Sequence, residues 1–402
     1  MNLRDAIDFA LHVLALLALV PALVLFFELC AASRWRPRAI EHEARAREAA
    51  RLAVVMPAHD EAGGIEAAIR AILPQLRAAD RLVVVADNCA DATASVALAA
   101  GAEVIERHDT ERRGKGYALD FGVRWLERDP PSVVVIVDAD CIVEPGALER
   151  LAASCIAHQR PMQALNLMHA PAGAPVSVRI AEFAWIVKNK VRPLGAAVMG
   201  WPCQLTGTGM AFPWAIVQRA PLASGDLVED MQLGLDLAAA GTPPMFCPEA
   251  RLSSVFPVDD AAVRSQRTRW EHGHLSVIAR GGPRLLARAI VRRDARLAAM
   301  ALDLMVPPLA SLILVLLALI TIGAGWVLAG GSAATLAISS FALALTGFGV
   351  VLAWSGHARA VVGGRELLGL PGYVLAKIPV YVRLFTQRQV EWVRTKRDEQ
   401  GH

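Results

Sequence analysis

Three long apolar stretches stand out along the chain, at residues 9–29, 300–328 and 333–354. Each is about as long as the roughly 20 residues that a helix needs to cross a bilayer. The pattern therefore predicts three transmembrane helices. Asp303 and the pair Pro307–Pro308 interrupt the second stretch near its start. Because proline removes a helical hydrogen bond, we expect the first turn of that stretch at the membrane interface.

A fourth apolar stretch, at residues 367–385, is less regular. It contains Pro371, Lys377, Pro379 and Arg383. Such a mixture is typical of a helix that lies in the membrane interface. We interpret the stretch as an interfacial or re-entrant helix, with a further span as the alternative.

The charges beside the first apolar stretch predict its orientation. Arg34, Arg36 and Arg38 follow it directly. By the positive-inside rule the N-terminus lies outside and residue 34 onward lies in the cytoplasm. A signal peptide is the alternative, but the length of the stretch and the position of the charges favour an anchor. The sequence thus predicts a multi-pass protein of a bacterial-type inner (cytoplasmic) membrane.

Between about residues 51 and 280 the pattern changes to short apolar runs that alternate with helical stretches. Strands are predicted at residues 52–56, 82–86, 103–106 and 133–137. Helices are predicted at residues 64–76, 90–100, 115–127 and 231–239. Strands buried on both faces and separated by helices indicate an α/β domain with a mostly parallel, Rossmann-like sheet.

Composition supports membrane segments and excludes some classes of protein. Apolar residues make up 55% of the chain, against about 45–50% in soluble domains. A net charge of only +3 argues against a nucleic-acid-binding protein. The six cysteines form no CxxC pair, so we expect reduced thiols and no zinc site.

Acidic and polar residues follow three of the predicted strands. They are Pro57 to Glu61, the pair Asp87–Asn88, and the segment Asp138-Ala-Asp140. Ligands bind at the carboxyl ends of strands in such a sheet. Acids brought together there repel, and a divalent cation with a diphosphate would neutralise them. Two carboxylates at i and i+2 suit Mg²⁺ or Mn²⁺, although solvated loop acids are the alternative.

Three further motifs allow two interpretations each. Glu229–Asp230 either complements the N-terminus of a helix or supplies a general base. The segment from Gln266 to Trp270 is either a basic face with an interface anchor or a phosphate-binding element, since guanidinium groups match phosphate geometry. Gly207-Thr208-Gly209 is either a simple turn or a place where the backbone approaches an acceptor closely.

The ordered set of motifs resembles the family 2 inverting glycosyltransferases, and more narrowly their membrane-integrated branch with the Q/R-x-x-R-W signature. That branch includes cellulose, chitin and hyaluronan synthases and ceramide and hopanoid glucosyltransferases. The match covers about residues 50–280. It implies a GT-A catalytic domain with transmembrane and interfacial helices. His59–Asp60 replaces an aromatic residue and Asn common in the family, and Val228 replaces a Thr.

The resemblance implies a role for each motif. Asp230 would be the general base, with Glu229 beside it. Asp138 and Asp140 would hold a divalent cation, Mg²⁺ or Mn²⁺. The donor-binding residues would be Pro57, His59, Glu61, Asp87, Lys115, Asp138, Asp140, Gln266, Arg269 and Trp270. The acceptor side would comprise Gly207, Thr208, Gly209 and Trp270.

These expectations divide the chain into five parts. They are an anchor at 1–33, a cytoplasmic GT-A domain at 50–255, interfacial helices with the Gln266–Trp270 motif at 256–298, two transmembrane helices at 299–356, and an interfacial or re-entrant helix with a basic tail at 357–402. The expected function is transfer of a sugar from a nucleotide sugar, a UDP-sugar by the resemblance, to a lipid or lipid-linked acceptor in envelope glycolipid or polysaccharide biosynthesis.

Three alternatives remain. A processive exopolysaccharide synthase needs walls for a pore, and three spans offer few; a second copy of the chain or an export partner would have to supply the rest. A non-catalytic scaffold or nucleotide sensor is disfavoured because all the expected acids are present. A transporter is disfavoured because the spans are too few.

Overall fold

A computed structural model describes the chain at residues 3–37, 47, 50–225, 228–256 and 260–386, with side chains described except at 260–270 and 383–386. The described residues form two compact units. The sheet unit contains residues within Arg36–Pro171 and Trp201–Gly273. The helical unit contains residues within Met1–Trp35, Ala172–Gly200 and His274–Gln389.

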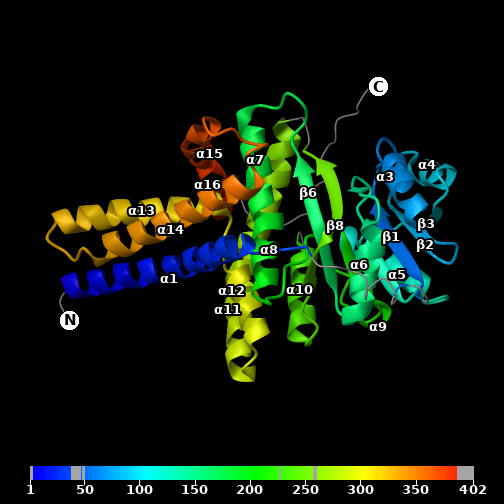
Figure 1. Ribbon diagram of the computed structural model, residues 1–402, viewed down its shortest axis with the longest axis horizontal. Helices are drawn as coiled ribbons and strands as arrows, with labels where there is room; N and C mark the ends of the chain where they lie inside the picture. Colours follow the sequence, from blue (N-terminus) through cyan, green and yellow to red (C-terminus); the bar gives the residue numbers. More distant parts are fainter. Residues whose placement is uncertain (1–2, 38–46, 48–49, 226–227, 257–259, 387–402) are drawn as a thin grey trace. The chain divides into compact units, whose positions relative to one another are not determined.

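The sheet unit is built on one eight-stranded sheet with the order β3-β2-β1-β4-β7-β6-β8-β5 (Figure 1). Its strands are β1 Leu52–Ala58, β2 Arg81–Asp87, β3 Glu103–Arg107, β4 Val133–Ile136, β5 Ile142–Val143, β6 Met162–His169, β7 Met210–Pro213 and β8 Met245–Val255. The first four strands in the order are parallel. β7 is antiparallel to both of its neighbours, whereas β6 and β8 are parallel. β5 pairs antiparallel with β8 at the edge.

Helices cover both faces of this sheet. They are α3 Ile65–Ile72, α4 Thr93–Ala99, α5 Lys115–Leu126, α6 Ala147–His158, α9 Trp214–Val217 and α10 Glu229–Ala239. Alternate residues of β1 enter opposite cores: Val54 packs with α3, α4 and α6, and Val55 packs with α5, α9 and α10. Because successive side chains of a strand point to opposite faces, burial on both faces explains the unbroken apolar runs.

The expected α/β fold class is confirmed. The four predicted strands correspond to β1 to β4, and the helix predicted at 231–239 begins two residues earlier, at Glu229. The helix predicted at 64–76 ends as the 3-10 turn η1 Leu73–Gln75. The second half of the sheet, β5 to β8, was not predicted as strands.

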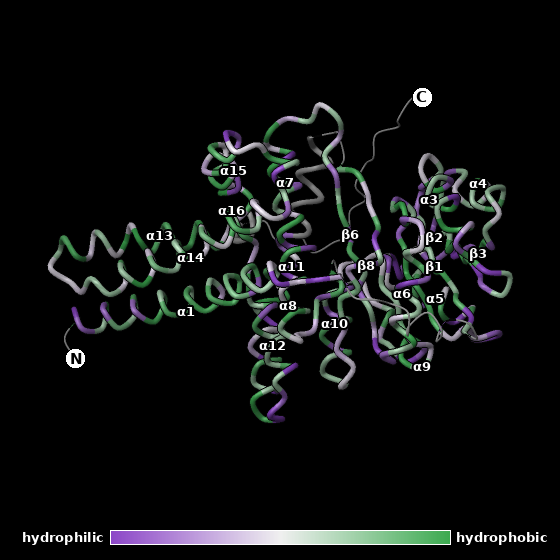
Figure 2. The backbone as a smooth tube through the Cα atoms, in the orientation of Figure 1, coloured by the Kyte–Doolittle hydropathy of each residue, from purple (hydrophilic) through white to green (hydrophobic). Residues whose placement is uncertain are grey.

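The helical unit contains three helices that are long and apolar enough to cross a membrane: α1 Leu3–Ala32, α13 Leu309–Leu328 and α14 Ala334–His357. They lie side by side (Figure 1), and they form the most continuously hydrophobic part of the chain in Figure 2. The rings of Phe26 and Phe348 pack 6.1 Å apart between α1 and α14. Their positions agree with the three predicted stretches.

Polar contacts fix the N-terminal end of α1 against the connection between α13 and α14. Asp8 Oδ1 accepts hydrogen bonds from Trp326 Nε1 at 2.7 Å and from the backbone N–H of Ser332 at 3.1 Å. Arg4 donates to the carbonyl of Ala329 at 3.0 Å. The C-terminal ends of α1 and α14 therefore lie at the same end of the three-helix group.

A buried ion cluster joins three helices near the C-terminal end of α1. Arg192, at the start of α8 Arg192–Val198, donates to Glu28 Oε2 at 2.6 Å. It also donates to Asp303 Oδ1 at 2.6 Å, within α12 Ala295–Leu304. A Cβ on Gly195 would lie 1.8 Å from the carbonyl O of Glu28. α8 therefore contacts the backbone of α1 so closely that only glycine fits.

The remaining elements differ from the predicted divisions. The second apolar stretch is two helices, α12 and α13, separated at Pro307–Pro308. Residues 172–200 form α7 Val176–Ile186, the π-helix η2 Val187–Val191 and α8, and they belong to the helical unit. The predicted domain 50–255 thus contains residues of both units. The stretch 367–385 corresponds to η3 Glu366–Gly369, α15 Leu370–Leu375 and α16 Ile378–Thr386.

Candidate functional site

The carboxyl ends of β2, β1 and β4, three neighbouring parallel strands, bring the acidic loops to one edge of the sheet. Asp87 is the last residue of β2, and Asp138 follows β4. Neighbouring strands lie about 4.8 Å apart. Acids on β2 and β4 therefore lie within reach of one extended ligand at this edge, as the sequence predicted.

Lys115 lies at the centre of the site. Its Nζ atom is 2.5 Å from Oδ1 of Asp138 and donates to the carbonyl of Gly207 at 2.7 Å. Lys115 begins α5, directly after Gly114, whose φ is 128°. Burial alone would lower the pKa of Lys115, but the charges of Asp138, Glu229 and Asp230 outweigh burial and raise it. The ammonium is thus held charged among three carboxylates.

Glu229 and Asp230 approach this ammonium from the N-terminus of α10. A Cβ on Gly207 would lie 3.2 Å from Asp230 Oδ2 and 3.4 Å from Lys115 Nζ. Burial, with the charge of Asp230 beside it, raises the pKa of Glu229 to about 7. Carboxylates at a helix N-terminus are stabilised by the helix dipole. The two interpretations of this pair are therefore compatible in one structure.

The segment Thr206–Gly209 contacts both Lys115 and Asp138. Gly207 and Gly209 have φ angles of 87° and 64°, which L-residues with a side chain rarely adopt. Thr208 Oγ1 accepts the backbone N–H of Asp138 at 3.0 Å. Backbone conformation therefore favours glycine at both positions. Gly207 is also required by the close approach of Asp230, and Gly209 by that of Leu252, whose Cδ1 would lie 2.8 Å from an added Cβ.

Asp138 and Asp140 fit a divalent cation. Their carboxylate oxygens and Cys141 Sγ all lie within 4.8 Å of one another. Mg²⁺ and Mn²⁺ prefer oxygen ligands and keep several waters. Burial, together with the negative charge of Asp140, raises the pKa of the Cys141 thiol well above its usual value. The thiol stays protonated, so the two carboxylates are the groups that suit the metal.

Asp87, at the end of β2, takes part in a separate network of hydrogen bonds. Arg107 Nη1 donates to Asp87 Oδ1 at 2.6 Å, and His59 Nδ1 donates to the Asp87 carbonyl at 2.6 Å. Burial raises the pKa of Asp87, and the hydrogen bond from Arg107 opposes this shift. Asp109 accepts a second hydrogen bond from Arg107, at 2.9 Å. The network orients Asp87 and joins it to the loop that leads to Lys115.

The other residues of the first motif lie at the end of β1. Pro57 is within the strand, and Glu61 follows it in the loop before α3. The backbone N–H of Glu61 donates to Thr93 Oγ1 at 2.7 Å. This bond joins the loops after β1 and β2, which places His59 and Glu61 at the same edge as Asp87.

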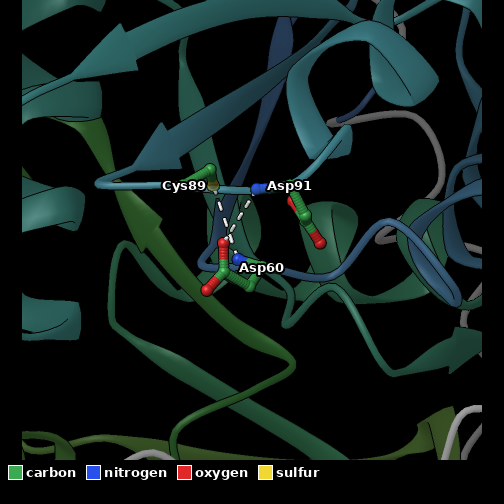
Figure 3. Close-up of side chains that lie close together, drawn as sticks. All are labelled: Asp60, Cys89 and Asp91. Carbon is green, nitrogen blue, oxygen red and sulfur yellow. Dashed lines mark hydrogen bonds between the residues drawn. The ribbon is translucent and has the colours of Figure 1, made fainter.

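A second acidic group, Asp60, Cys89 and Asp91, lies in these loops (Figure 3). Asp60 Oδ1 accepts the backbone N–H groups of Ala90 and Asp91, and the N–H of Asp60 donates to Cys89 Sγ. Asp91 in turn caps the start of α4 through the N–H of Thr93 at 2.9 Å. These hydrogen bonds join the loops after β1 and β2, and they account for the closeness of the three side chains.

The predicted motif Gln266, Arg269 and Trp270 lies in helix α11 Asp260–Arg292. The side chains of this motif are outside the described residues. Their predicted role in donor and acceptor binding therefore stays a prediction.

Sequence reasoning missed two residues that hold the site together. Arg107 ends β3 and contacts Asp87, and Gln163 lies buried in β6 beneath the Thr206–Gly209 segment. Arg107 is one of many arginines, so nothing in the sequence singles it out. Gln163 carries a signal, because a polar residue inside an otherwise apolar buried run requires hydrogen-bond partners.

Comparison with solved structures identifies the fold. The chain is similar to the mannosyltransferase PcManGT from Pyrobaculum calidifontis, solved in complex with GDP-Man and Mn²⁺, with a TM-score of 0.57 and 18% identity over 94% of this chain and 100% of that one. Glucosyl-3-phosphoglycerate synthase from Mycobacterium tuberculosis, in complex with Mn²⁺, UDP and glucosyl-3-phosphoglycerate, gives a TM-score of 0.40 and 22% identity over 60% of this chain and 85% of that one. A search of curated proteins found no match.

The sheet topology, the acids at its edge and this likeness define the class: the chain has the GT-A fold of glycosyltransferases. The family follows from the sequence itself. Residues 49–273, more than half of the chain, match the model of the family described as glycosyltransferase like family 2. The chain belongs to that family and is a glycosyltransferase.

Proposed function

We propose that this protein is a membrane-bound inverting glycosyltransferase that moves a sugar from a nucleotide sugar to a lipid or lipid-linked acceptor. The observation that supports the proposal most is the position of Lys115. Its ammonium lies between Asp138, on the predicted donor side, and the pair Glu229–Asp230, on the predicted acceptor side. One site thus contains a group for each half of the reaction.

In the transfer step Asp230 acts as the general base. Its carboxylate accepts the proton of the acceptor hydroxyl as the hydroxyl oxygen attacks the anomeric carbon. The new C–O bond forms as the bond to the diphosphate breaks on the opposite face, so the configuration is inverted. Gly207 leaves space in front of Asp230 Oδ2, because any Cβ there would lie only 3.2 Å away.

The leaving group is a nucleoside diphosphate, whose charge must be stabilised. Asp138 and Asp140 would hold a divalent cation, which when bound would supply Lewis-acid stabilisation of that charge. Lys115 adds a fixed positive charge beside Asp138. Asp87, held by Arg107, contacts the nucleoside with His59 and Glu61. Gln266, Arg269 and Trp270 complete the donor and acceptor contacts in this proposal.

Three apolar helices support a membrane setting for the acceptor. α1, α13 and α14 are each long and apolar enough to cross a bilayer. In the proposal the N-terminus is outside, the sheet unit is cytoplasmic, and the membrane is a bacterial-type inner membrane. The donor is a UDP-sugar; PcManGT was solved with GDP-Man, so GDP-sugars belong in any test.

The test is a panel of UDP-, GDP- and dTDP-sugars with the purified chain, Mg²⁺ or Mn²⁺, and a membrane lipid extract. We expect nucleotide release that requires the lipid extract and stops when a chelator removes the cation. Release that is unaffected by the extract would contradict a lipid acceptor. If no donor reacts, the scaffold or sensor hypothesis gains support.

A processive exopolysaccharide synthase is the second candidate, favoured by the family 2 domain together with apolar helices. The two candidates differ in product length. Mass spectrometry of the product should show one added sugar per acceptor. Long chains would favour the processive synthase.

A further inference from the structure

Gln163 is one of two buried polar side chains, with Asn166, in the mostly apolar strand β6. It is the second residue of β6, whose sequence is MQALNLMH, and only 2% of its surface is exposed. Burying an amide without hydrogen-bond partners is costly, because the group loses its hydrogen bonds to water. A glutamine at this position must therefore be held by hydrogen bonds, and the direction of these bonds indicates its role.

The bonds of Gln163 converge on one segment. Its Nε2 group donates to the carbonyl of Thr208 at 2.9 Å and to that of Ala164 at 2.9 Å. Its Oε1 atom accepts the backbone N–H of Thr206 at 2.9 Å. The amide thus binds both a donor and an acceptor of the segment Thr206–Gly209, which a carboxylate or an apolar side chain cannot do.

This segment contacts three of the residues assigned to the reaction. The Gly207 carbonyl accepts from Lys115, and Gly207 faces Asp230. Thr208 Oγ1 accepts the backbone N–H of Asp138. The segment has little regular structure of its own, with two left-handed glycines within four residues. Its position therefore depends on the bonds from beneath it.

We propose that Gln163 is a positioning residue for glycosyl transfer. It holds the segment Thr206–Gly209 in the position in which the segment contacts Lys115, Asp138 and Asp230. The proposal rests on the proposed function. Gln163 is buried and bonds the segment, so it acts through the segment. The nucleoside end of the site is held separately, by the bond from Arg107 to Asp87.

The test compares Gln163→Met with Gln75→Met. Gln75 is a matched control, because it also bonds backbone groups of other elements: its Nε2 donates to the Val143 carbonyl at 3.3 Å and its Oε1 accepts the Leu148 N–H at 3.4 Å. We expect Gln163→Met to lower kcat at least tenfold and to change the donor KM less than threefold. Gln75→Met should change kcat less than threefold.

A second readout does not depend on turnover. Hydrogen–deuterium exchange should become at least tenfold faster at the amides of Thr206 and Asp138 in Gln163→Met, and should stay unchanged there in Gln75→Met. Should Gln163→Met fail to fold, Gln163→Asn keeps the amide but is one methylene shorter, and the same two results are expected.

The outcomes separate the two proposals. If the wild type transfers no sugar, the proposed function fails, while faster exchange would still support the positioning role. If the wild type is active and the Gln163 variants keep kcat within threefold, or show unchanged exchange at Asp138, the positioning role is overturned.

Discussion

At the scale of single residues, the balance of charge around Lys115 explains why four ionisable groups are stable at one sheet edge. One ammonium faces Asp138, Glu229 and Asp230, so the apo site has an excess of negative charge. Like charges in a partly buried site repel unless they are paired or protonated. Burial and, after it, the charge of Asp230 raise the pKa of Glu229, and a bound divalent cation would relieve the excess of negative charge.

The metal ligands can be tested by comparing Cys141 with Asp140. Because the thiol is buried and its pKa is raised, we expect Cys141→Ser to keep transfer and Mn²⁺ affinity within about threefold. Asp140→Asn should lose at least about tenfold in Mn²⁺ affinity, since it removes a charged oxygen ligand. Titration of Mn²⁺ by electron paramagnetic resonance measures both. Equal losses in the two variants would make the thiol a ligand.

The pKa of Glu229 predicts a pH dependence of stability. Its ordinary value is 4.5 and its folded value is about 7, so the folded state binds more protons than the unfolded state between these values. The free energy of unfolding therefore falls as pH rises through this window. Glu229→Gln should make the thermal midpoint less dependent on pH between about 5 and 7 in the absence of divalent cations.

The control is Glu127→Gln, at an exposed position on the C-terminal side of α5. This variant should keep the pH dependence of the wild type. If Glu229→Gln also keeps it, Glu229 does not titrate in this range.

The site residues at the strand ends could be predicted from the sequence, whereas the residues that hold them in place could not. Asp138 could be found because it follows a run of five buried apolar residues, 133–137. Gln163 and Arg107 act through contacts between segments distant in sequence. Such contacts leave no local pattern around Arg107, and Gln163 shows only as a polar residue in a mostly apolar run. Gly207 was expected at a close approach, but the group that approaches it, Asp230, is known only from the fold.

At the scale of elements, apolar runs predicted the parallel half of the sheet and the three long helices. β6 was missed because Gln163 and Asn166 interrupt its apolar run, and β7 because it is only four residues long. The segment 172–200 falls within the predicted domain 50–255 but belongs to the helical unit. Tertiary packing against α1 decides its place.

The packing of α8 against α1 gives a prediction at this scale. Gly195→Ala should destabilise the helical unit by about 1–3 kcal/mol or more, since the new Cβ would overlap the carbonyl O of Glu28. Gly347→Ala in α14 is the control, because nothing lies within 4 Å of a Cβ there. Thermal unfolding in detergent measures both. Equal midpoints for the two variants would show that α8 and α1 are not in close contact.

At the scale of the whole molecule, a family 2 catalytic domain and a group of candidate spans occur in one chain. The sheet unit supplies the groups for transfer, and the helical unit is suited to a bilayer. The orientation proposed for these candidate spans rests on the arginines after α1 and on the hydrogen bond from the backbone N–H of Ser332 to Asp8.

This orientation predicts opposite labelling at the two ends of α14. Cysteines introduced at the exposed positions Ala333 and Ala360 lie before and after the helix. In intact spheroplasts an impermeant maleimide should label Ala333→Cys above the wild-type background, and should label Ala360→Cys only after lysis. The reverse pattern would invert the proposed topology.

In the proposed mechanism Asp230 acts on the acceptor in the same site that binds the donor through Asp138 and Asp140. The variant Asp230→Asn tests this, with donor affinity measured by calorimetry and transfer measured with the lipid acceptor. We expect donor affinity within about threefold of the wild type and transfer reduced by about 10²–10⁴-fold, because the general base is lost. Transfer within about threefold of the wild type would show that Asp230 is not the general base.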